Sequence, residues 1–399
     1  MSLETRFLRL TPTDTLFFRD GRPYNQDDDG LAHARSLFPP HPSTVTGAVR
    51  AALALGNGWN GRAGWHTGLV TLLGDGPAMD GGKVSFGPLL LLRECGAAWQ
   101  PLYPAPLSLI AEAAAPPLGW GNFALRRPGP PVDCDLGRGV RLPMGESGCD
   151  SRKAVSDLWL TPAGLALVLA GRAGELDPTR QGTDRHLFHS RELWATEPRV
   201  GLERNNNSRT AVRGRLYAPV HVRLRQGVSL GVEVTGPWTE MKPPAPLVSL
   251  GGEHRTAHVD TVERPAPPAP PATLHPAPGG GMCVTLTLIT PARVDAAWLT
   301  PNGPLPGGAR IVSACLGKPV PIGGWDSRDG AARGPRALRG FLPAGSTWFL
   351  HAPPGWAASP PMTAIGDAVD TRHGFGRFVL GTFIDSAGGT DTAHRGDQS

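Results

Sequence analysis

A stretch rich in proline and glycine, PAPPAPPATLHPAPGGG at residues 265–281, constrains the fold of this chain more than any other feature. Proline fixes one backbone angle and has no amide proton, so such a run suits neither a helix nor the interior of a sheet. It predicts a stiff linker or a long loop at 264–281. We therefore expect one domain at 1–263 and a second at 282–399, with an insert inside a single domain as the alternative.

Glycine and proline are also frequent elsewhere in the chain. With 53 glycines and 43 prolines in 399 residues, many turns and short strands are expected rather than a helical bundle. Hydrophobic residues make up 40% of the chain, enough to form buried cores and to exclude wholesale disorder. The length fits about two domains. We predict an α+β fold in which strands alternate with a few helices.

Hydrophobic periodicity places the individual elements. A hairpin is expected within 213–234, turning at Gln226 and Gly227. Residues 101–143 show weak periodicity and dense proline and glycine, which predicts a long insertion or surface loop reaching to about 160. Strands are expected at 6–10, 15–19, 84–93, 283–290, 310–314 and 346–351, and helices at 43–55, 162–170 and 363–369.

Charge and cysteine content narrow the class of function. A formal charge of +5 and a pI near 9.2 suit an anionic partner such as nucleic acid. The five cysteines have no zinc-site spacing, so neither a metal nor another cofactor is expected. Their odd number, together with a charged N-terminus that lacks an apolar signal core, favours a location in the reducing cytoplasm. No apolar run is long enough to span a bilayer, so no membrane partner is expected.

The segment from Leu16 to Leu53 combines an aromatic strand, a charged turn and the start of a helix. A helix N-terminus offers unpaired N–H groups and a partial positive charge, both of which suit a phosphate. Ser43 or Thr44 is expected to cap this helix. The alternative is an ordinary strand, turn and helix with surface arginines. The residues expected to contact nucleic acid here are Arg19, Arg22, Ser43, Thr44 and Arg50.

A second candidate is the arginine-dense segment Arg199–Arg215, which surrounds the run Asn205–Ser208. Guanidinium groups bind phosphates and side-chain amides read base edges, so such a loop can hold single-stranded RNA. A solvated loop without a ligand is the alternative. The expected contacts are Arg204, Arg209 and Arg213.

Two glycine-bearing segments are further candidates, because glycine lets a backbone approach a phosphate closely. The motif GFGRFVLG matches neither a dinucleotide fingerprint nor a P-loop, and tight turns are the alternative for both segments. Trp325, in GGWD, is either a stacking surface or a buried core residue. The expected contacts are Gly251, Gly252 and Arg255 in the first segment and Gly374, Gly376 and Arg377 in the second.

Catalysis has little support in the sequence. The run Asp27–Asp29 is better explained as a solvated loop than as a metal site, because adjacent side chains diverge. His33, His41 and His66 could act as general bases in RNA cleavage, but none lies in a recognisable catalytic motif. We therefore expect no enzymatic activity and no catalytic residue.

Six blocks in the chain resemble one family. They are RDGRP with SLFPPHPSTVTGAVR, RVGLERNNNSRTAVRGRLY, LGGEHRTAHV, PIGGWD, FLPAGSTWFL and GFGRFVLG. Together they are similar to the RAMP-superfamily subunit of the Cmr module, in type III-B CRISPR effectors, that binds the 5′ handle of the guide RNA (crRNA). The resemblance implies two ferredoxin-like, RRM-related domains with long loop insertions. It also implies contacts with the crRNA 5′ handle, the large polymerase-like subunit and the backbone RAMP subunits.

Three hypotheses follow. The first is a non-catalytic subunit that binds crRNA and acts as a scaffold. The second is a RAMP endoribonuclease that processes precursor crRNA, which a cleavage assay on repeat RNA separates from the first. The third is a sheet-based protein-interaction module without RNA contacts, which would purify free of nucleic acid.

Overall fold

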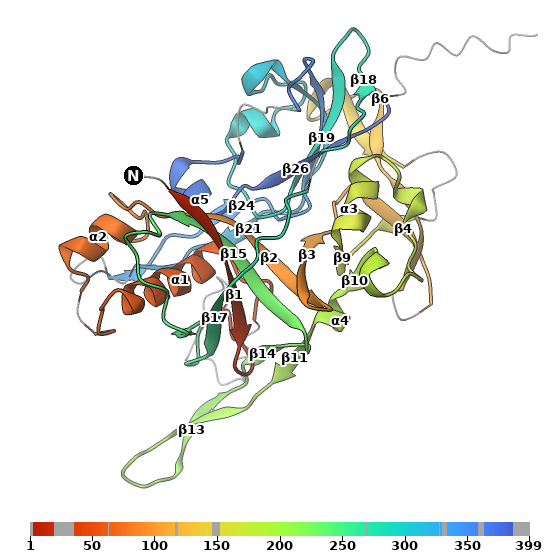
Figure 1. The fold of residues 1–399 in the computed structure, drawn as a ribbon. Coiled ribbons are helices and arrows are strands. Elements are labelled where there is room, and N and C mark those ends of the chain that lie inside the picture. The colour runs from red at the N-terminus through yellow and green to blue at the C-terminus, as the bar shows by residue number, and fades with distance from the viewer. Residues whose placement is uncertain are drawn as a thin grey trace, which may run out of the picture.

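The computed structural model describes residues 3–19, 36–62, 64–115, 119–145, 152–268, 270–326, 328, 333–357 and 363–385. Strands dominate these residues and are accompanied by five α-helices (Figure 1). The fold therefore mixes the two kinds of element, as an α+β class predicts. None of the described helices is long and apolar enough to cross a membrane.

The N-terminal half is built on an eight-stranded antiparallel sheet with the order β10-β9-β3-β2-β15-β1-β17-β16. Helices α1 (Pro42–Gly56) and α2 (Thr67–Leu73) pack on one face, where Leu8 and Leu10 of the sheet meet Val49 of α1. The strands are β1 (Glu4–Pro12), β2 (Ser85–Cys95), β3 (Ala98–Pro104), β9 (Leu158–Leu160), β10 (Leu187–His189), β15 (Val228–Gly236), β16 (Leu247–Ser249) and β17 (Thr256–Val262).

The C-terminal half has its own five-stranded sheet, with β19 between β25 and β26. The order β26-β19-β25-β20 repeats that of β17-β1-β15-β2 in the first half: the first strand of each set is central and the third and fourth flank it. Helix α5 (Ala368–Arg372) precedes the last strand. The strands are β18 (His275–Pro276), β19 (Met282–Leu288), β20 (Arg310–Cys315), β25 (Thr347–Ala352) and β26 (Phe378–Thr382).

For residues 101–143 the surface-loop alternative is wrong, because most of this region forms short strands. Prolines lie within the ribbon of β6 and β7, where Pro128 is opposite Pro143. Helix α3 (Pro162–Leu169) follows as predicted, with Thr161 Oγ1 accepting a hydrogen bond from Gly164 N–H at 3.2 Å. The strands are β4 (Leu109–Ala113), β5 (Trp120–Leu125), β6 (Arg127–Cys134), β7 (Gly137–Met144) and β8 (Lys153–Ala154).

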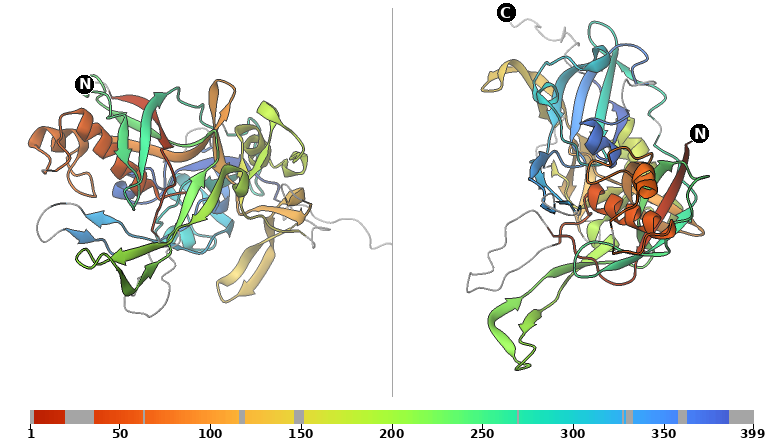
Figure 2. Two further views of the ribbon diagram at one scale, coloured as in Figure 1. Left: turned by 90° about the horizontal axis from the view of Figure 1, so that it is seen from below. Right: turned by 90° about the vertical axis from the view of Figure 1, so that its left-hand side faces the viewer.

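Two-stranded ribbons extend from this body (Figure 2). One continues from β11 and β14 into the hairpin of β12 and β13, and another is an arm made of β21 to β24 (Figures 1 and 2). These elements are β11 (Trp194–Pro198), β12 (Gly201–Arg204), β13 (Ala211–Tyr217), β14 (Val220–Leu224), β21 (Val320–Ile322), β22 (Trp325–Asp326), β23 (Gly334–Pro335) and β24 (Arg339–Phe341), with the short helix α4 (Ser190–Leu193) before β11.

Three further predictions need correction. The hairpin expected within 213–234 is wrong, because β14 pairs with β11 while β15 pairs with β1 and β2. The strand expected at 15–19 is reduced to isolated bridges, from Leu16 to Val222 and from Arg19 to Ser36. The helix expected at 363–369 forms later in the chain, as α5. The helix at 43–55 and the other expected strands are confirmed.

The proline-rich segment 264–281 contains only the two-residue strand β18 among its described residues. It connects two halves of the protein that also contact each other directly, since α5 packs near β2 and β7 near β20. The boundary drawn there stays a prediction.

Candidate nucleic-acid interface

Helix α1 begins one residue earlier than expected and has a different cap. His41 is the N-cap and Pro42 follows at the first helical position, where its fixed backbone angle and missing N–H fit. Ser43 and Thr44 therefore lie half-buried inside the first turn, and the prediction that either caps the helix is wrong. The His41 side chain makes no capping hydrogen bond, although Thr44 N–H donates to the His41 carbonyl at 3.0 Å.

Arg50 lies inside the protein. It is 9% exposed and donates hydrogen bonds to the carbonyls of Leu73 (3.2 Å), Gly74 (2.6 Å) and Gly76 (3.0 Å). Its guanidinium lies over the Trp65 ring, and burial lowers its pKa to about 10. These contacts hold the turn after α2, and this placement does not favour an RNA contact by Arg50.

The other candidates of the first segment divide between exposed and undescribed positions. Arg19 is exposed, and its backbone forms an isolated antiparallel β-bridge with Ser36. Arg22, Asp27–Asp29 and His33 lie outside the described residues.

The glycine-rich segment near the C-terminus packs against protein backbone. A Cβ added at Gly374 would lie 2.0 Å from the Gly87 carbonyl oxygen, and one at Gly376 would lie 1.8 Å from that of Ile365. Both glycines have positive φ, at +84° and +70°. The close backbone approach that glycine permits is therefore made to β2 and to the segment before α5, which does not favour phosphate contacts at these two positions.

Cationic side chains around these glycines bind carbonyls of the N-terminal half. Arg372 donates to the carbonyls of Val84 (3.0 Å) and Met79 (2.7 Å), and also to that of Gly82. Arg377 donates to the Phe86 carbonyl at 2.9 Å. His373 Nε2 lies 2.7 Å from the Pro77 carbonyl oxygen, so this residue also joins the two halves, and we call residues 372–377 the docking segment.

The segment containing Gly251 and Gly252 is a tight turn between β16 and β17. Gly252 N–H donates to the Phe17 carbonyl at 2.8 Å, and a Cβ at Gly251 would lie 2.4 Å from the same oxygen. Arg255 pairs with Asp14, Nη1 to Oδ2, at 3.1 Å. Here too the glycines admit a neighbouring protein carbonyl, and Arg255 has a carboxylate partner.

The arginine-dense segment has the opposite character. Strands β12 and β13 form a hairpin that projects from the body in every view (Figures 1 and 2). At its tip Arg209 N–H donates to the Asn205 carbonyl at 2.8 Å, which closes the turn. Arg204 and Arg209 are exposed and form no ion pair with any described residue. Arg213 lies on β13, and its side chain is outside the described residues.

An ion-pair cluster anchors the root of this hairpin. Asp14 pairs with Arg199 at 3.0 Å and with Arg223 at 2.9 Å, and Glu197 binds the same two arginines. Hydrogen bonds from Arg223 and Arg199 lower the Glu197 pKa to about 2. The cluster orients the base of the hairpin and leaves its tip free to contact a ligand.

The arm of β21 to β24 holds basic and aromatic residues that sequence analysis missed or left open. Trp325 is 62% exposed, which excludes the buried alternative for this side chain. Arg339 lies on β24 and Arg336 lies between β23 and β24, and neither forms an ion pair with any described residue. The signal was the sequence GPRALRG, whose arginines follow the tryptophan motif closely.

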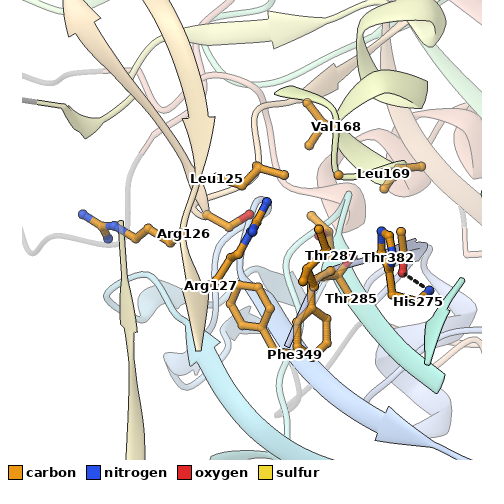
Figure 3. A pocket seen from close by; sticks show the side chains of 14 residues that line it. Leu125, Arg126, Arg127, Val168, Leu169, His275, Thr285, Thr287, Phe349 and Thr382 are labelled. Carbon is orange, nitrogen blue, oxygen red and sulfur yellow. Dashed lines mark hydrogen bonds between the residues drawn. The ribbon is translucent and has the colours of Figure 1, made fainter. Parts of the chain in front are cut away.

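A small pocket of about 20 Å³ with mixed polar and apolar walls lies between the two halves (Figure 3). Thr285, Thr287 and Thr382 of the C-terminal sheet face Leu125 and Leu169 across it. Arg127 extends toward the pocket, whereas Arg126 extends away from it (Figure 3). The pocket has room for roughly one water molecule, so it is a packing gap at the contact between the halves.

One cluster of metal-ligand residue types was also missed. Ligand atoms of Cys283, His351 and Asp385 lie within 4.8 Å of one another. Both Asp385 oxygens are already bound by Arg141, at 2.6 and 2.8 Å, and His351 Nε2 lies 2.8 Å from Oδ2. The guanidinium supplies the positive charge at this carboxylate, so the arrangement is a buried ion-pair network between β7, β25 and the end of the described chain.

Comparison with known proteins identifies the family. The family described as CRISPR-associated protein (Cas_Cmr3) matches residues 8–383. This chain belongs to that family. All six sequence blocks lie within the matched range, and so do the projecting hairpin and the arm.

Solved structures give a weaker likeness. The chain is similar to a chain of the type III-B Cmr-beta complex bound to cognate target RNA and AMPPnP, with 13% identity, a TM-score of 0.46 and 86% of each chain covered. A second structure of Cmr-beta with cognate target RNA gives 14% identity, a TM-score of 0.46 and 86% coverage of each chain. No curated protein matches this member of the Cas_Cmr3 family.

Proposed function

We propose that this Cas_Cmr3 family member is a non-catalytic crRNA-binding and scaffolding subunit of a type III-B CRISPR effector. It holds the 5′ handle of the guide and joins the large polymerase-like subunit to the backbone RAMP filament. The observation that carries the proposal is the projecting hairpin β12–β13, whose tip presents Arg204 and Arg209 without ion-pair partners among the described residues.

The topology supports the RAMP architecture. In each half the first strand is central, the third and fourth flank it, and the second lies beyond the third. With α1 after the first strand of one half and α5 before the last strand of the other, this is the antiparallel order of a ferredoxin-like domain. We therefore propose two such domains, the first carrying the insertion that β4 to β8 build.

Separate apolar surfaces support contacts with two protein partners. Val200 and Leu202 are 72% and 54% exposed at the base of the hairpin. Leu136 and Met144 are 60% and 53% exposed on the ribbon of β6 and β7, and Figures 1 and 2 place that ribbon at the opposite end of the molecule. Exposed apolar side chains of this kind suit protein interfaces.

The described histidines support a role without catalysis. A general base works best with a pKa near the working pH. Burial lowers the pKa of His41 to about 4, so it is a weak base for a ribose hydroxyl. His66 forms the N-cap of α2.

The test is a binding and cleavage assay on the purified full chain. We expect it to bind a guide with an intact 5′ handle at least tenfold more tightly than one whose handle is scrambled, and to return both uncut with or without magnesium. Cleavage that follows the protein through two columns and falls in a His41→Ala variant would support the endoribonuclease instead. Absence of binding to either RNA at moderate salt would overturn the proposal in favour of a protein-interaction module.

A further inference from the structure

The arm of β21 to β24 is anchored to the rest of the protein at two places. Beyond β22, Arg328 pairs with Asp326 at 2.7 Å and lies 3.8 Å from Asp75, which follows α2. At the base of the arm, the Phe341 ring packs against Phe375 of the docking segment, with ring centroids 4.9 Å apart. Side chains between these anchors therefore have a defined position.

Trp325 lies between the two anchors and faces solvent. It is 62% exposed and pairs with Pro335 across the ribbon of β22 and β23. Directly opposite residues of an antiparallel pair project to the same face, so the indole and the proline ring form one small apolar surface. Gly323 and Gly324 come just before Trp325 and have no side chain that could cover it.

Two arginines lie close to this surface. Arg336 N–H donates to the Gly324 carbonyl at 2.9 Å, which places Arg336 beside the position of Trp325 in the ribbon. Arg339 is opposite Ile322 on β21, three residues before the tryptophan, and three residues of extended chain span roughly 10 Å. Both arginines therefore belong to the surroundings of the exposed indole.

Protein carboxylates do not balance the charge of these two arginines. Arg336 and Arg339 form no ion pair with any described residue, whereas the nearby Asp326 is bound by Arg328. A phosphate can therefore bind there without displacing a carboxylate, and guanidinium groups suit it.

Arg336 and Arg339 also line a cavity of about 20 Å³, together with His373 and the first turn of α1. The N-terminal end of that helix adds partial positive charge. The acidic residue in the wall, Asp370, is already paired with Arg293 at 2.9 Å. The side of the arm next to α1 is therefore positive as well.

These features fit a nucleobase better than a protein partner. Exposed apolar side chains on the arm are few, namely Trp325, Pro335 and Leu338, and they offer far less area than the roughly 800 Å² that each partner of a stable protein interface buries. A base needs only one aromatic face, with cations nearby for its phosphates. Both views of Figure 2 also place the arm and the hairpin β12–β13 on the same side of the molecule.

We propose that Trp325 is a stacking platform for one base of the bound RNA, while Arg336 and Arg339 neutralise the neighbouring phosphates. This inference rests on the proposed function and deepens it, because it adds a second contact for the strand that the hairpin holds. Every base has an aromatic face, so the contact fixes the position of a nucleotide without reading its identity.

The first experiment scans the handle RNA with single abasic nucleotides against the full-length protein. We expect one position at which removal of the base weakens binding about tenfold, as loss of a stacking contact predicts. Exchange of the base at that position for any other should change binding less than threefold. Abasic penalties within twofold at every position, with binding of the intact RNA retained, would overturn this inference and leave the proposed function standing.

Variants of the exposed tryptophan assign the penalty to the arm. Trp325→Ala should bind intact RNA about tenfold more weakly, and its abasic penalty at that position should fall to about onefold. Trp325→Phe keeps an aromatic face and should retain most of the penalty. Leu136→Ala is the matched control, because Leu136 is 60% exposed at the opposite end of the molecule, and it should bind as wild type.

Two results would refute the assignment to Trp325. One is a full abasic penalty in Trp325→Ala, which would place the base elsewhere. The other is wild-type affinity of Trp325→Ala for every RNA, which would favour a protein partner for the arm. A retained preference for the intact handle over a scrambled one would leave the proposed function standing in both cases.

The arginines are tested separately. In the double variant Arg336→Gln with Arg339→Gln, the log–log salt dependence of RNA binding should flatten by about 0.7 for each phosphate that is no longer neutralised. The abasic penalty should remain, because Trp325 is unchanged. A folded double variant with an unchanged slope would contradict the phosphate contacts.

Discussion

The docking segment and the hairpin β12–β13 have similar local sequences, since both combine arginine with small or polar residues, yet the fold uses them in opposite ways. The donors of Arg372 and Arg377 bind carbonyls of the other half of the protein. On the hairpin, Arg204 and Arg209 are exposed and form no ion pair with any described residue, so their donors remain available to an outside ligand. The difference is decided by which acceptors the rest of the fold leaves open.

The turn between α2 and β2 supplies those acceptors. Residues 74–84 contain little regular structure, and several of their carbonyls lack a strand or helix partner. A buried carbonyl without a hydrogen-bond partner costs free energy, so nearby guanidinium groups stabilise the fold by donating hydrogen bonds to these carbonyls. Arginine near a glycine turn is therefore weak evidence for a phosphate site when such a segment lies close by.

The largest effect that tests the contrast between the docking segment and the hairpin is expected at Gly376. An alanine there would place Cβ against the Ile365 carbonyl at a φ of +70°, and we expect Gly376→Ala to lose about 4 kcal/mol of unfolding free energy or to fail to fold. Gly355→Ala is the matched control: its φ is +80° but nothing lies within 4 Å, so a loss of about 1 kcal/mol is expected. Equal losses by denaturant titration would mean that close packing plays no part at Gly376.

The next largest effect is a loss of folding stability in acid. Burial lowers the pKa of His373 to about 4, with Arg50, Arg336 and Arg372 adding to the shift and the Pro77 carbonyl opposing it. The unfolded ring binds a proton near pH 6.5, so stability should fall as pH drops from about 6.5 to 4, by on the order of 3 kcal/mol.

Urea titrations across that range check the acid effect. His373→Phe should lower the stability at neutral pH and flatten the profile. A hairpin variant that lacks Arg204 and Arg209 should keep the full slope, because those side chains are not buried with the histidine. An unchanged profile in His373→Phe would show that another group titrates.

A moderate effect is expected on RNA binding from the hairpin. The triple variant of Arg204, Arg209 and Arg213 to alanine should keep its unfolding midpoint. For every phosphate that the variant no longer neutralises, the log–log salt dependence of single-strand binding should flatten by about 0.7. Arg172→Ala with Arg180→Ala is the control, since each of these arginines pairs with a neighbouring carboxylate. A folded triple variant with an unchanged slope would remove the hairpin from the RNA interface.

The smallest effect belongs to the root of the hairpin. The lowered pKa of Glu197, about 2, means that its ion pairs contribute above pH 4.5 and are lost as pH falls toward 2. Because the pairs are partly exposed, Glu197→Gln should move the unfolding midpoint by only about 1 °C at neutral pH. Scanning calorimetry should also show a weaker acid dependence in the variant, and a shift of many degrees would mean that the root is a core element.

Periodic segments allowed much of the fold to be predicted. The apolar face of α1 and the alternating pattern of β19 identify them because one face of each is buried. The insertion was expected, but its short strands were missed because proline and glycine hid their periodicity. Strands β14 and β15 were paired wrongly because each pairs with a strand that is not its neighbour in the chain.

The candidate site was harder to predict. Local sequence identifies a donor but not the acceptor that it meets. Arg50 was a candidate because of its charge, and Gly374 because glycine permits close backbone approach. The groups that these two residues actually meet are backbone carbonyls within residues 73–87. Conversely, Arg336 and Arg339 gain their place beside His373 only because the two halves meet there.

The central place of β1 in its sheet also governs how the chain is made. Arg9 on β1 bonds to Asp260 on β17, a separation of 251 residues. During synthesis the first strand must wait for most of the N-terminal half to leave the ribosome before either neighbour can pair with it, and such distant pairing slows folding and prolongs the exposure of bare strand edges. The chain between β1 and its partner strands can also vary in length. Doubling the length of a flexible loop raises its closure cost by only about 0.6 kcal/mol, so β4 to β8 occupy a place where evolution can lengthen or shorten the chain without redesigning the sheet.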